Sequence, residues 1–237
     1  MKYIILLLIF VSAVRASAQG IAVLELFTSQ GCSSCPAADK YLTQVIQDAE
    51  KNGKPIYGLS FHVDYWNHIG WKDPYCDARF TDRQKNYAER MPLKDVYTPQ
   101  IVINGQRSFV GSDKTYIEKF VDESLAQNSS YTITISDPVV ADGNVQINYS
   151  IDKSPSNATI NFAIVERELE NFVPRGENNG KTLRHDNVVR VFKSMRLKKN
   201  GVVELKLPEI NLAKSSIIAY AQDSDLHVVA ATGKALK

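Results

Sequence analysis

The sequence predicts an α/β domain that is followed by an all-β domain. In the N-terminal half, apolar β-rich runs alternate with helical patterns, an order typical of a sheet with parallel strands and helices on its faces. Beyond residue 128 the pattern changes to short alternating runs without a convincing helix, which favours an antiparallel sandwich. With 237 residues and 44% hydrophobic composition, the chain can form one large domain or two ordinary ones. We therefore expect one domain over residues 19–128 and a second over residues 129–237.

Residues 1–18 have the pattern of a cleaved secretory signal peptide. Lys2 precedes an apolar run from Tyr3 to Val14, and Ala16-Ser17-Ala18 supplies the small residues of a cleavage site. The alternative is a membrane anchor, but the run is shorter than the ~20 residues of a spanning helix, and Arg15 ends it. We expect a periplasmic or secreted mature chain without a stable membrane span. Disulfides persist in such oxidising compartments.

The first elements of the mature chain predict a β-α-β unit. The run from Ile21 to Phe27 is apolar and rich in β-forming residues. From Cys32 to about Lys51 apolar residues recur at helical spacing, and Pro36 falls in the first turn, where its missing N–H costs little. The run from Pro55 to Val63 predicts a second buried strand.

The remainder of the first half predicts an aromatic loop, a helix, a hairpin and a last helix. Asn104-Gly105 after a short apolar run is a strong hairpin signal. Ser112 or Asp113 can cap the last helix, which extends to about Leu125. The expected elements are a loop over 64–74, a helix over 75–90, strands over 101–103 and 107–111, and a helix from 113.

The second half contains a polar block between its β runs. Arg175-Gly176-Glu177-Asn178 and the stretch from His185 to Arg190 place charged and amide side chains close together in the sequence. Such loops could bind an anion or connect the two halves, and we expect the connecting role.

Charge excludes some partners. The formal charge of +2 falls to about zero once Lys2 and Arg15 are removed with the signal peptide. A near-neutral chain does not point to nucleic acid or to an anionic membrane surface. No sequence feature indicates a bound cofactor.

The motif Cys32-Ser33-Ser34-Cys35 has three interpretations. It can be a redox dithiol, because a cysteine at a helix N-terminus has a lowered pKa and a second cysteine can close a disulfide with it. It can be a structural disulfide in a binding protein. It can also belong to a zinc or copper site with Cys76 and His62 or His68, although no second C-x-x-C is present.

Thr98-Pro99, directly before the predicted hairpin, adds a second signal. Residues 20–127 resemble the thioredoxin superfamily. The shared features are the order of strands and helices, a C-x-x-C at the first helix and an X-Pro before the hairpin. The resemblance implies a mixed central sheet with flanking helices and a cis peptide bond before Pro99. It also implies that Cys32 attacks, that Cys35 resolves through a Cys32–Cys35 disulfide, and that Pro99 aligns the partner.

Longer stretches narrow the resemblance. Five stretches are similar to a family of secreted bacterial proteins catalogued as domain of unknown function 1223. They are VLELFTSQGCSSCPAADKYL, FHVDYWNHIGWKDPY, YTPQIVINGQ, RGENNGKTLRHDNVVRVF and IIAYAQDSDLHVVAA. The similarity covers nearly the whole mature chain. It implies a fold and a compartment, and no particular reaction.

Several further residues are candidates around the cysteine pair. A dense aromatic loop could form one wall of a cleft beside Cys32, or it could simply pack on itself. Glu25 lies near the position of the buried acid of thioredoxins, but it is one residue out of register with it, which would turn it to the other sheet face. We predict that Cys76 is an inert, buried thiol. The expected groove residues are Ser33, Ser34, Thr98, Trp66 and Trp71.

The leading functional hypothesis is thiol-disulfide exchange with protein or small-molecule thiols and disulfides of the cell envelope. Cys32, Cys35 and Pro99 would form its catalytic centre, without a metal. The alternatives are a non-catalytic envelope binding protein with a structural disulfide, or a copper or zinc carrier. The exposure of Cys32 separates the first two, because an enzyme needs its attacking sulfur beside a groove.

Overall fold

The computed structural model describes residues 20–153 and 155–236. The predicted signal peptide over residues 1–18 lies outside the described residues. Within the described part, no helix is long and apolar enough to cross a membrane.

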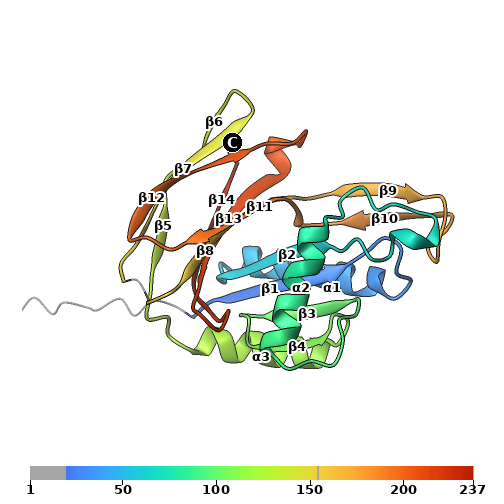
Figure 1. The fold of residues 1–237 in the computed structure, drawn as a ribbon, viewed down its shortest axis with the longest axis horizontal. Helices are drawn as coiled ribbons and strands as arrows, with labels where there is room; N and C mark the ends of the chain where they lie inside the picture. The colour runs from blue at the N-terminus through green and yellow to red at the C-terminus, as the bar shows by residue number, and fades with distance from the viewer. Residues whose placement is uncertain (1–19, 154, 237) are drawn as a thin grey trace, which may run out of the picture.

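The largest element of the fold is a mixed sheet of eight strands in the order β14-β13-β8-β11-β2-β1-β3-β4 (Figure 1). β2 pairs in parallel with both β1 and β11, and the other neighbours in the sheet are antiparallel. The eight strands are β1 (Ala22–Thr28), β2 (Ile56–His62), β3 (Gln100–Ile103), β4 (Arg107–Val110), β8 (Thr159–Glu166), β11 (Val188–Arg196), β13 (Ser215–Gln222) and β14 (Val228–Ala235). The fold is therefore a mixed α/β fold, as expected for the N-terminal half.

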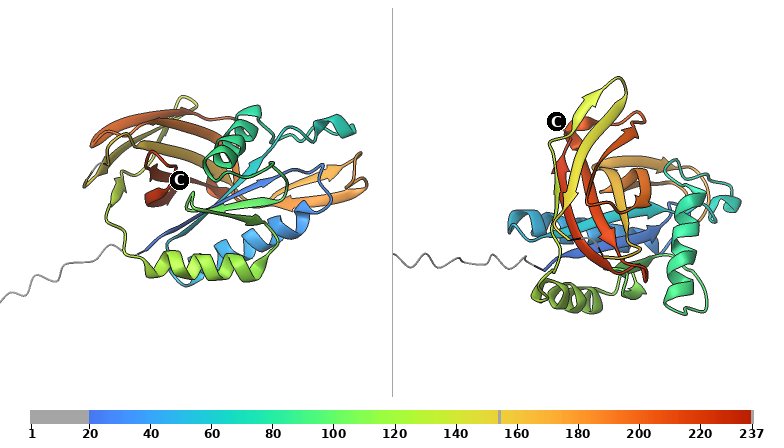
Figure 2. Two further views of the ribbon diagram at one scale, coloured as in Figure 1. Left: turned by 60° about the horizontal axis from the view of Figure 1, so that its bottom comes forward. Right: turned by 60° about the vertical axis from the view of Figure 1, so that its left-hand side comes forward.

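Helices cover both faces of the N-terminal part of this sheet. α1 (Cys35–Lys51) and α3 (Lys114–Ala126) lie on one face of the sheet (Figure 2). There, Leu42 and Ile117 belong to one buried cluster with Leu24 of β1. α2 (Ala78–Arg90) covers the other face through Phe80 and Tyr87. Two short 3-10 turns, Asn67–Ile69 and Leu212–Lys214, complete the helical elements of the described residues. All seven residues of β1 are buried, because helices cover both faces of this strand.

Helix α1 begins later than the sequence pattern predicts. Its first residue is Cys35 and its N-cap is Ser34, so Cys32 lies in the turn that precedes the helix. The physical reason is Pro36, which favours the first turn of a helix and therefore fixes the start near itself. The expectation that Cys32 sits at the first helical position is thus wrong by three residues.

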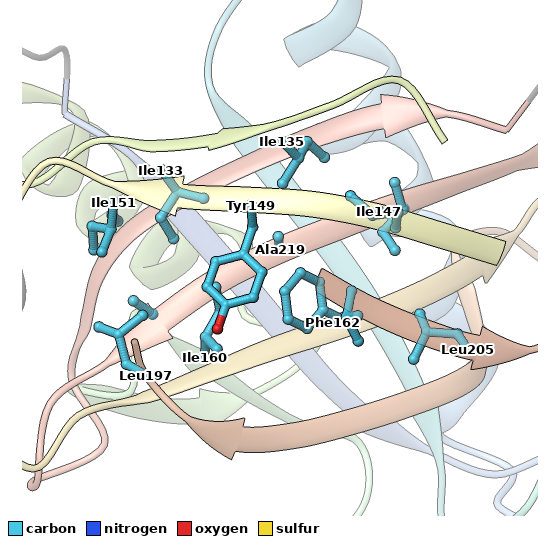
Figure 3. Packing of buried hydrophobic residues seen from close by; sticks show 14 of the residues in the cluster. Ile133, Ile135, Ile147, Tyr149, Ile151, Ile160, Phe162, Leu197, Leu205 and Ala219 are labelled. Carbon is cyan, nitrogen blue, oxygen red and sulfur yellow. The ribbon is translucent and has the colours of Figure 1, made fainter. Parts of the chain in front are cut away.

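A smaller antiparallel sheet packs on the C-terminal part of the large one. In β7, Val145, Ile147, Tyr149 and Ile151 are buried in alternation, as expected for a strand with one face toward a core. Figure 3 shows Tyr149 against Phe162 of β8, with ring centroids 5.4 Å apart. The small sheet contains β5 (Ile133–Ile135), β6 (Val139–Ala141), β7 (Asn144–Ile151) and β12 (Asn200–Lys206).

The large sheet continues across the predicted domain boundary. β11, from the second half of the chain, pairs with β2 from the first half, where Val188 lies beside Ser60. The division into two domains stays a prediction, whereas the shared sheet is an observed feature. It brings the hairpin β9 (Leu169–Val173) and β10 (Lys181–His185) over the loops at the ends of β1 and β2 (Figure 1).

Candidate functional site

Cys32 and Cys35 lie at the junction of β1 and α1. A tight turn positions them, in which the backbone N–H of Cys35 donates to the carbonyl of Cys32 at 3.3 Å. Cys32 is 1% exposed and Cys35 is fully buried. Both are free cysteines in this structure, so the disulfide between them stays a prediction.

The sulfur of Cys32 contacts the loop that carries the proline. Its Sγ lies 3.7 Å from the backbone oxygen of Thr98 and 3.2 Å from Oγ of Ser34. The Thr98–Pro99 peptide bond is cis, the conformation that the resemblance implies. The structure therefore brings Cys32, Thr98 and Pro99 together, as expected from the two motifs.

The two thiols differ strongly in acidity. The hydrogen bond from Cys35 contributes most to lowering the pKa of Cys32, from 9.0 to about 6, and Ser34 and Thr98 contribute further against the opposing effect of burial. For Cys35, burial and the neighbouring Cys32 and Asp39 raise the pKa far above its ordinary range. Cys32 is thus the group that can exist as a thiolate at neutral pH, and Cys35 is a protonated donor beside it.

The predicted groove residues gather around Cys32, but they do not leave it open. Nε1 of Trp66 donates to Oγ1 of Thr98 at 2.7 Å, and Nε1 of Trp71 donates to Oε1 of Gln30 at 3.1 Å. Ser33 and Ser34 are exposed beside the buried Cys32. The expectation of an accessible Cys32 sulfur is therefore wrong for this structure, because other parts of the chain cover it.

The loop between β9 and β10 supplies one part of this cover. The buried amide of Asn178 donates to the carbonyl oxygens of Gln30 and Cys32, at 3.0 and 2.8 Å. The carboxylate of Glu177 accepts from the backbone N–H of Ser33 at 2.8 Å. We name residues 174–180 the covering loop. The polar block of the second half thus contacts the N-terminal half, as expected for its connecting role.

A buried polar cluster, largely missed by sequence reasoning, lies next to the cysteine pair. His62 and His185 stack edge to face with centroids 4.8 Å apart, and each contacts a carboxylate, Asp73 or Asp39. His62, the last residue of β2, has its Nδ1 2.7 Å from a carboxylate oxygen of Asp73. The sequence does contain one signal for Asp39: it lies four residues after Cys35, on the face of the helical pattern that is otherwise apolar.

Glu25 belongs to a different buried network. Its carboxylate contacts the Arg83 guanidinium at 2.6 and 2.7 Å and accepts from the hydroxyls of Tyr87 and Tyr220. It shares its strand face with Phe27, under α2, whereas Leu24 and Leu26 face α1. The shift of one residue has therefore turned Glu25 away from the helix that begins at Cys35.

Cys76 and His68, two candidate metal ligands, lie outside the cysteine turn. Cys76 is only half-buried, so the prediction of a buried thiol is wrong in part. It accepts a hydrogen bond from Nδ2 of Asn67 at 3.2 Å, and burial raises the pKa of its thiol. His68 lies on the surface, with Nδ1 2.8 Å from the carbonyl of Tyr65. Among residues 20–153 and 155–236, no three or more His, Cys, Asp and Glu side chains are arranged to hold a metal ion.

Comparison with known proteins places this geometry in a family. A family model described as "Protein of unknown function (DUF1223)" matches residues 23–222. No curated protein matches the chain.

Among solved structures, the X-ray structure of protein AGR_C_4864 from Agrobacterium tumefaciens is 26% identical, with a TM-score of 0.65, and the match covers 92% of this chain and 96% of that one. Part of a β-glucuronidase from Ruminococcus gnavus also matches, over 45% of this chain and 16% of the enzyme, at 9% identity and a TM-score of 0.26. This second likeness is too weak to carry an argument.

Proposed function

The chain belongs to the DUF1223 family, and we propose that it is a periplasmic or secreted thiol-disulfide oxidoreductase. In this proposal residues 19–128 form a thioredoxin-like domain and residues 129–237 a sandwich-like one that shares the large sheet. Its partners are thiols and disulfides of the cell envelope.

The observation that carries the proposal is the pairing of Cys32 with Cys35 beside Thr98-Pro99. The sulfur of Cys32 lies against the backbone oxygen of Thr98, and Cys35 is its hydrogen-bond donor. A thiol with a pKa of about 6 is largely thiolate at neutral pH, and only the thiolate attacks a disulfide. A purely structural pair does not require this difference between its two sulfurs.

The reaction follows from these roles. The Cys32 thiolate attacks one sulfur of a partner disulfide, forms a mixed disulfide and releases the other partner sulfur as a thiolate. Cys35 then attacks the Cys32 sulfur, closes the Cys32–Cys35 disulfide and releases the second thiolate. The partner gains two electrons and the cysteine pair loses two. Exchange runs in the opposite direction with a more reducing partner.

The burial of Cys32 favours a second candidate function, a non-catalytic envelope protein whose Cys32–Cys35 bond holds the start of α1 in place. Cys32 is 1% exposed, so its sulfur cannot meet a partner disulfide in this conformation. In the exchange proposal, the covering loop must therefore move before each reaction. Its three hydrogen bonds to the residues of the cysteine turn are few enough to break locally.

The two functions are separated by an exchange assay with glutathione disulfide. In a Cys76→Ser background, the proposal expects a mixed disulfide with glutathione to accumulate at Cys32 in Cys35→Ser, and rapid conversion to the internal disulfide when Cys35 is present. Mass spectrometry of acid-quenched samples follows both species. If Cys32 in the folded protein reacts no faster than Cys32 in the fully unfolded protein, the result would support the non-catalytic function and contradict the proposed enzyme activity.

A further inference from the structure

Asp39 is a buried carboxylate one helical turn after Cys35. The spacing of four residues places both side chains on the same face of α1. Asp39 is 5% exposed, and neither of its carboxylate oxygens has a hydrogen-bond partner among the described residues. A buried carboxylate without such a partner is costly and rare, so its presence next to a reactive thiol requires an explanation.

His185, from β10, is the nearest group to this carboxylate. Its Nδ1 lies 3.3 Å from Oδ2 of Asp39, without the geometry of a formed hydrogen bond. The contacts of Gln30 define the tautomer of His185. Oε1 of Gln30 accepts a hydrogen bond from Trp71, so the Gln30 amide nitrogen, Nε2, is the donor that faces Nε2 of His185 at 3.2 Å. The neutral imidazole therefore carries its proton on Nδ1, toward Asp39.

A cavity connects this pair with the surface. It has a volume of about 340 Å³, and Asp39 and His185 line it together with the exposed Lys40, Thr182 and Arg184. The cavity is lined by α1, β10 and Asp186, and none of its lining residues belongs to the covering loop that bonds Ser33 and Cys32. Water in this cavity can exchange protons with Asp39 while Cys32 remains covered.

We propose that Asp39 accepts the proton of Cys35 when Cys35 attacks the mixed disulfide, and that His185 positions the Asp39 carboxylate and connects it with the water of the cavity. This inference rests on the exchange function proposed above, and it assigns to α1 and β10 the proton transfer that Glu25 cannot perform, because Arg83 holds Glu25 in another network.

The step balances in atoms and charge. The S–H bond of Cys35 breaks and its proton moves to a carboxylate oxygen of Asp39. The Cys35 sulfur then forms a bond with the Cys32 sulfur, and the bond from Cys32 to the partner sulfur breaks. The partner leaves as a thiolate, and the neutral Asp39 returns its proton to the cavity water.

An electrostatic role of Asp39 makes the opposite kinetic prediction. The negative charge of Asp39 raises the pKa of the Cys35 thiol, so a variant without the charge would form the Cys35 thiolate more readily. Removal of a proton acceptor slows the same step. The sign of the effect therefore separates the two roles. Other titratable groups surround this site, and they stay the same when Asp39→Asn is compared with the parent protein: Cys32, Lys40, His62, Asp73, Tyr75, Arg184, His185, Asp186 and Arg190.

The test uses Ellman's reagent with the Cys76→Ser protein. The first equivalent of 2-nitro-5-thiobenzoate reports the attack by Cys32, and the second equivalent reports the attack by Cys35. We expect Asp39→Asn to slow the second phase at pH 7 by on the order of 100-fold, as for the loss of a general base. The first phase changes less than about threefold in this variant. Asp186→Asn, in the same cavity, is the matched control and keeps both phases.

Further variants make the outcome decisive. Added formate should restore the second phase in Asp39→Ala through the cavity, and His185→Gln should slow the second phase without a change in α1. A second phase that is unchanged or faster in Asp39→Asn would overturn the role of Asp39. If the parent protein releases no equivalent, or only one, the exchange function itself fails, and the two failures are thus distinguishable.

Discussion

Cys32 and Thr98, 66 positions apart in the sequence, meet with 3.7 Å between the sulfur and the backbone oxygen. The contact joins the turn after β1 to the residue before the cis proline, and Trp66 bonds the Thr98 side chain from the aromatic loop. These segments, together with the covering loop, therefore surround one sulfur.

The acidity of Cys32 should depend on Cys35. The hydrogen bond from Cys35 is the largest contribution that lowers the pKa of Cys32 to about 6. In the Cys76→Ser background, alkylation of Cys32 by iodoacetamide should reach half its maximal rate near pH 6. Cys35→Ala should move this midpoint toward the ordinary value of 9.0. A midpoint that is the same with and without Cys35 would contradict the assigned cause.

The covering loop should limit access to Cys32. Asn178→Ala removes two hydrogen bonds to the cysteine turn, of about 1 kcal/mol each. Together these bonds contribute about 2 kcal/mol, so opening of the loop should become roughly 30-fold more frequent, and alkylation of Cys32 at pH 8 should accelerate to the same extent. Asn179→Ala is the matched control, because Asn179 is exposed in the same loop. Equal rates in both variants would show that another segment controls access.

Features that depend on neighbouring residues in the sequence could be predicted. The turn at Asn104-Gly105 and the cap of α3 by Asp113 were visible in the sequence, because short-range chemistry decides them. The aromatic loop was also expected, and its two tryptophans do bond residues around the cysteines.

Features that depend on distant contacts could not be predicted. Asn178 reaches the carbonyl of Cys32 from 146 positions away, so no local pattern indicates that Cys32 is covered. The pairing of Val188 with Ser60 is equally hidden, because strand alternation does not identify the neighbouring strand. For Asp39, helical spacing alone shows a polar residue among apolar ones, and only the packing of β10 on α1 places His185 against it.

The buried pair of His62 and Asp73 should produce a stability maximum in acid. Burial opposes protonation of His62, but the Asp73 carboxylate outweighs burial and raises the His62 pKa above 6.5. Burial likewise opposes ionisation of Asp73, and His62 outweighs it and lowers the Asp73 pKa below 3.8. Because its pKa is raised on folding, His62 stabilises the fold at pH values below 6.5, and this stabilisation is lost as pH rises through the pKa of the folded state. Because its pKa is lowered on folding, Asp73 stabilises the fold at pH values above 3.8, and this stabilisation is lost as pH falls through the pKa of the folded state.

The variant Asp73→Asn should therefore lose about 3 kcal/mol of unfolding free energy, with the largest loss between about pH 4 and 6.5. Urea denaturation at a series of pH values measures this difference, with Asp122→Asn on the exposed surface of α3 as the control. A loss that is constant from pH 3 to pH 9 would show that the pair does not titrate as proposed.

Glu25 should be important for stability and unimportant for exchange. Glu25→Gln leaves the buried Arg83 guanidinium without its charged partner, which should cost about 3 kcal/mol in the free energy of unfolding. Both phases of the reaction with Ellman's reagent should keep their rates at 15 °C, where the variant remains folded. A selective slowing of the second phase would instead place Glu25 in the proton transfer and weaken the assignment of Asp39.

The reduction potential of Cys32 and Cys35 decides whether they form a reversible redox pair. The Cys76→Ser protein is equilibrated in glutathione and dithiothreitol buffers, quenched in acid, alkylated and analysed by mass spectrometry. The lowered pKa of Cys32 stabilises the reduced form, so we predict a potential above about −300 mV. A potential far below about −300 mV would identify a structural disulfide and contradict the proposed function.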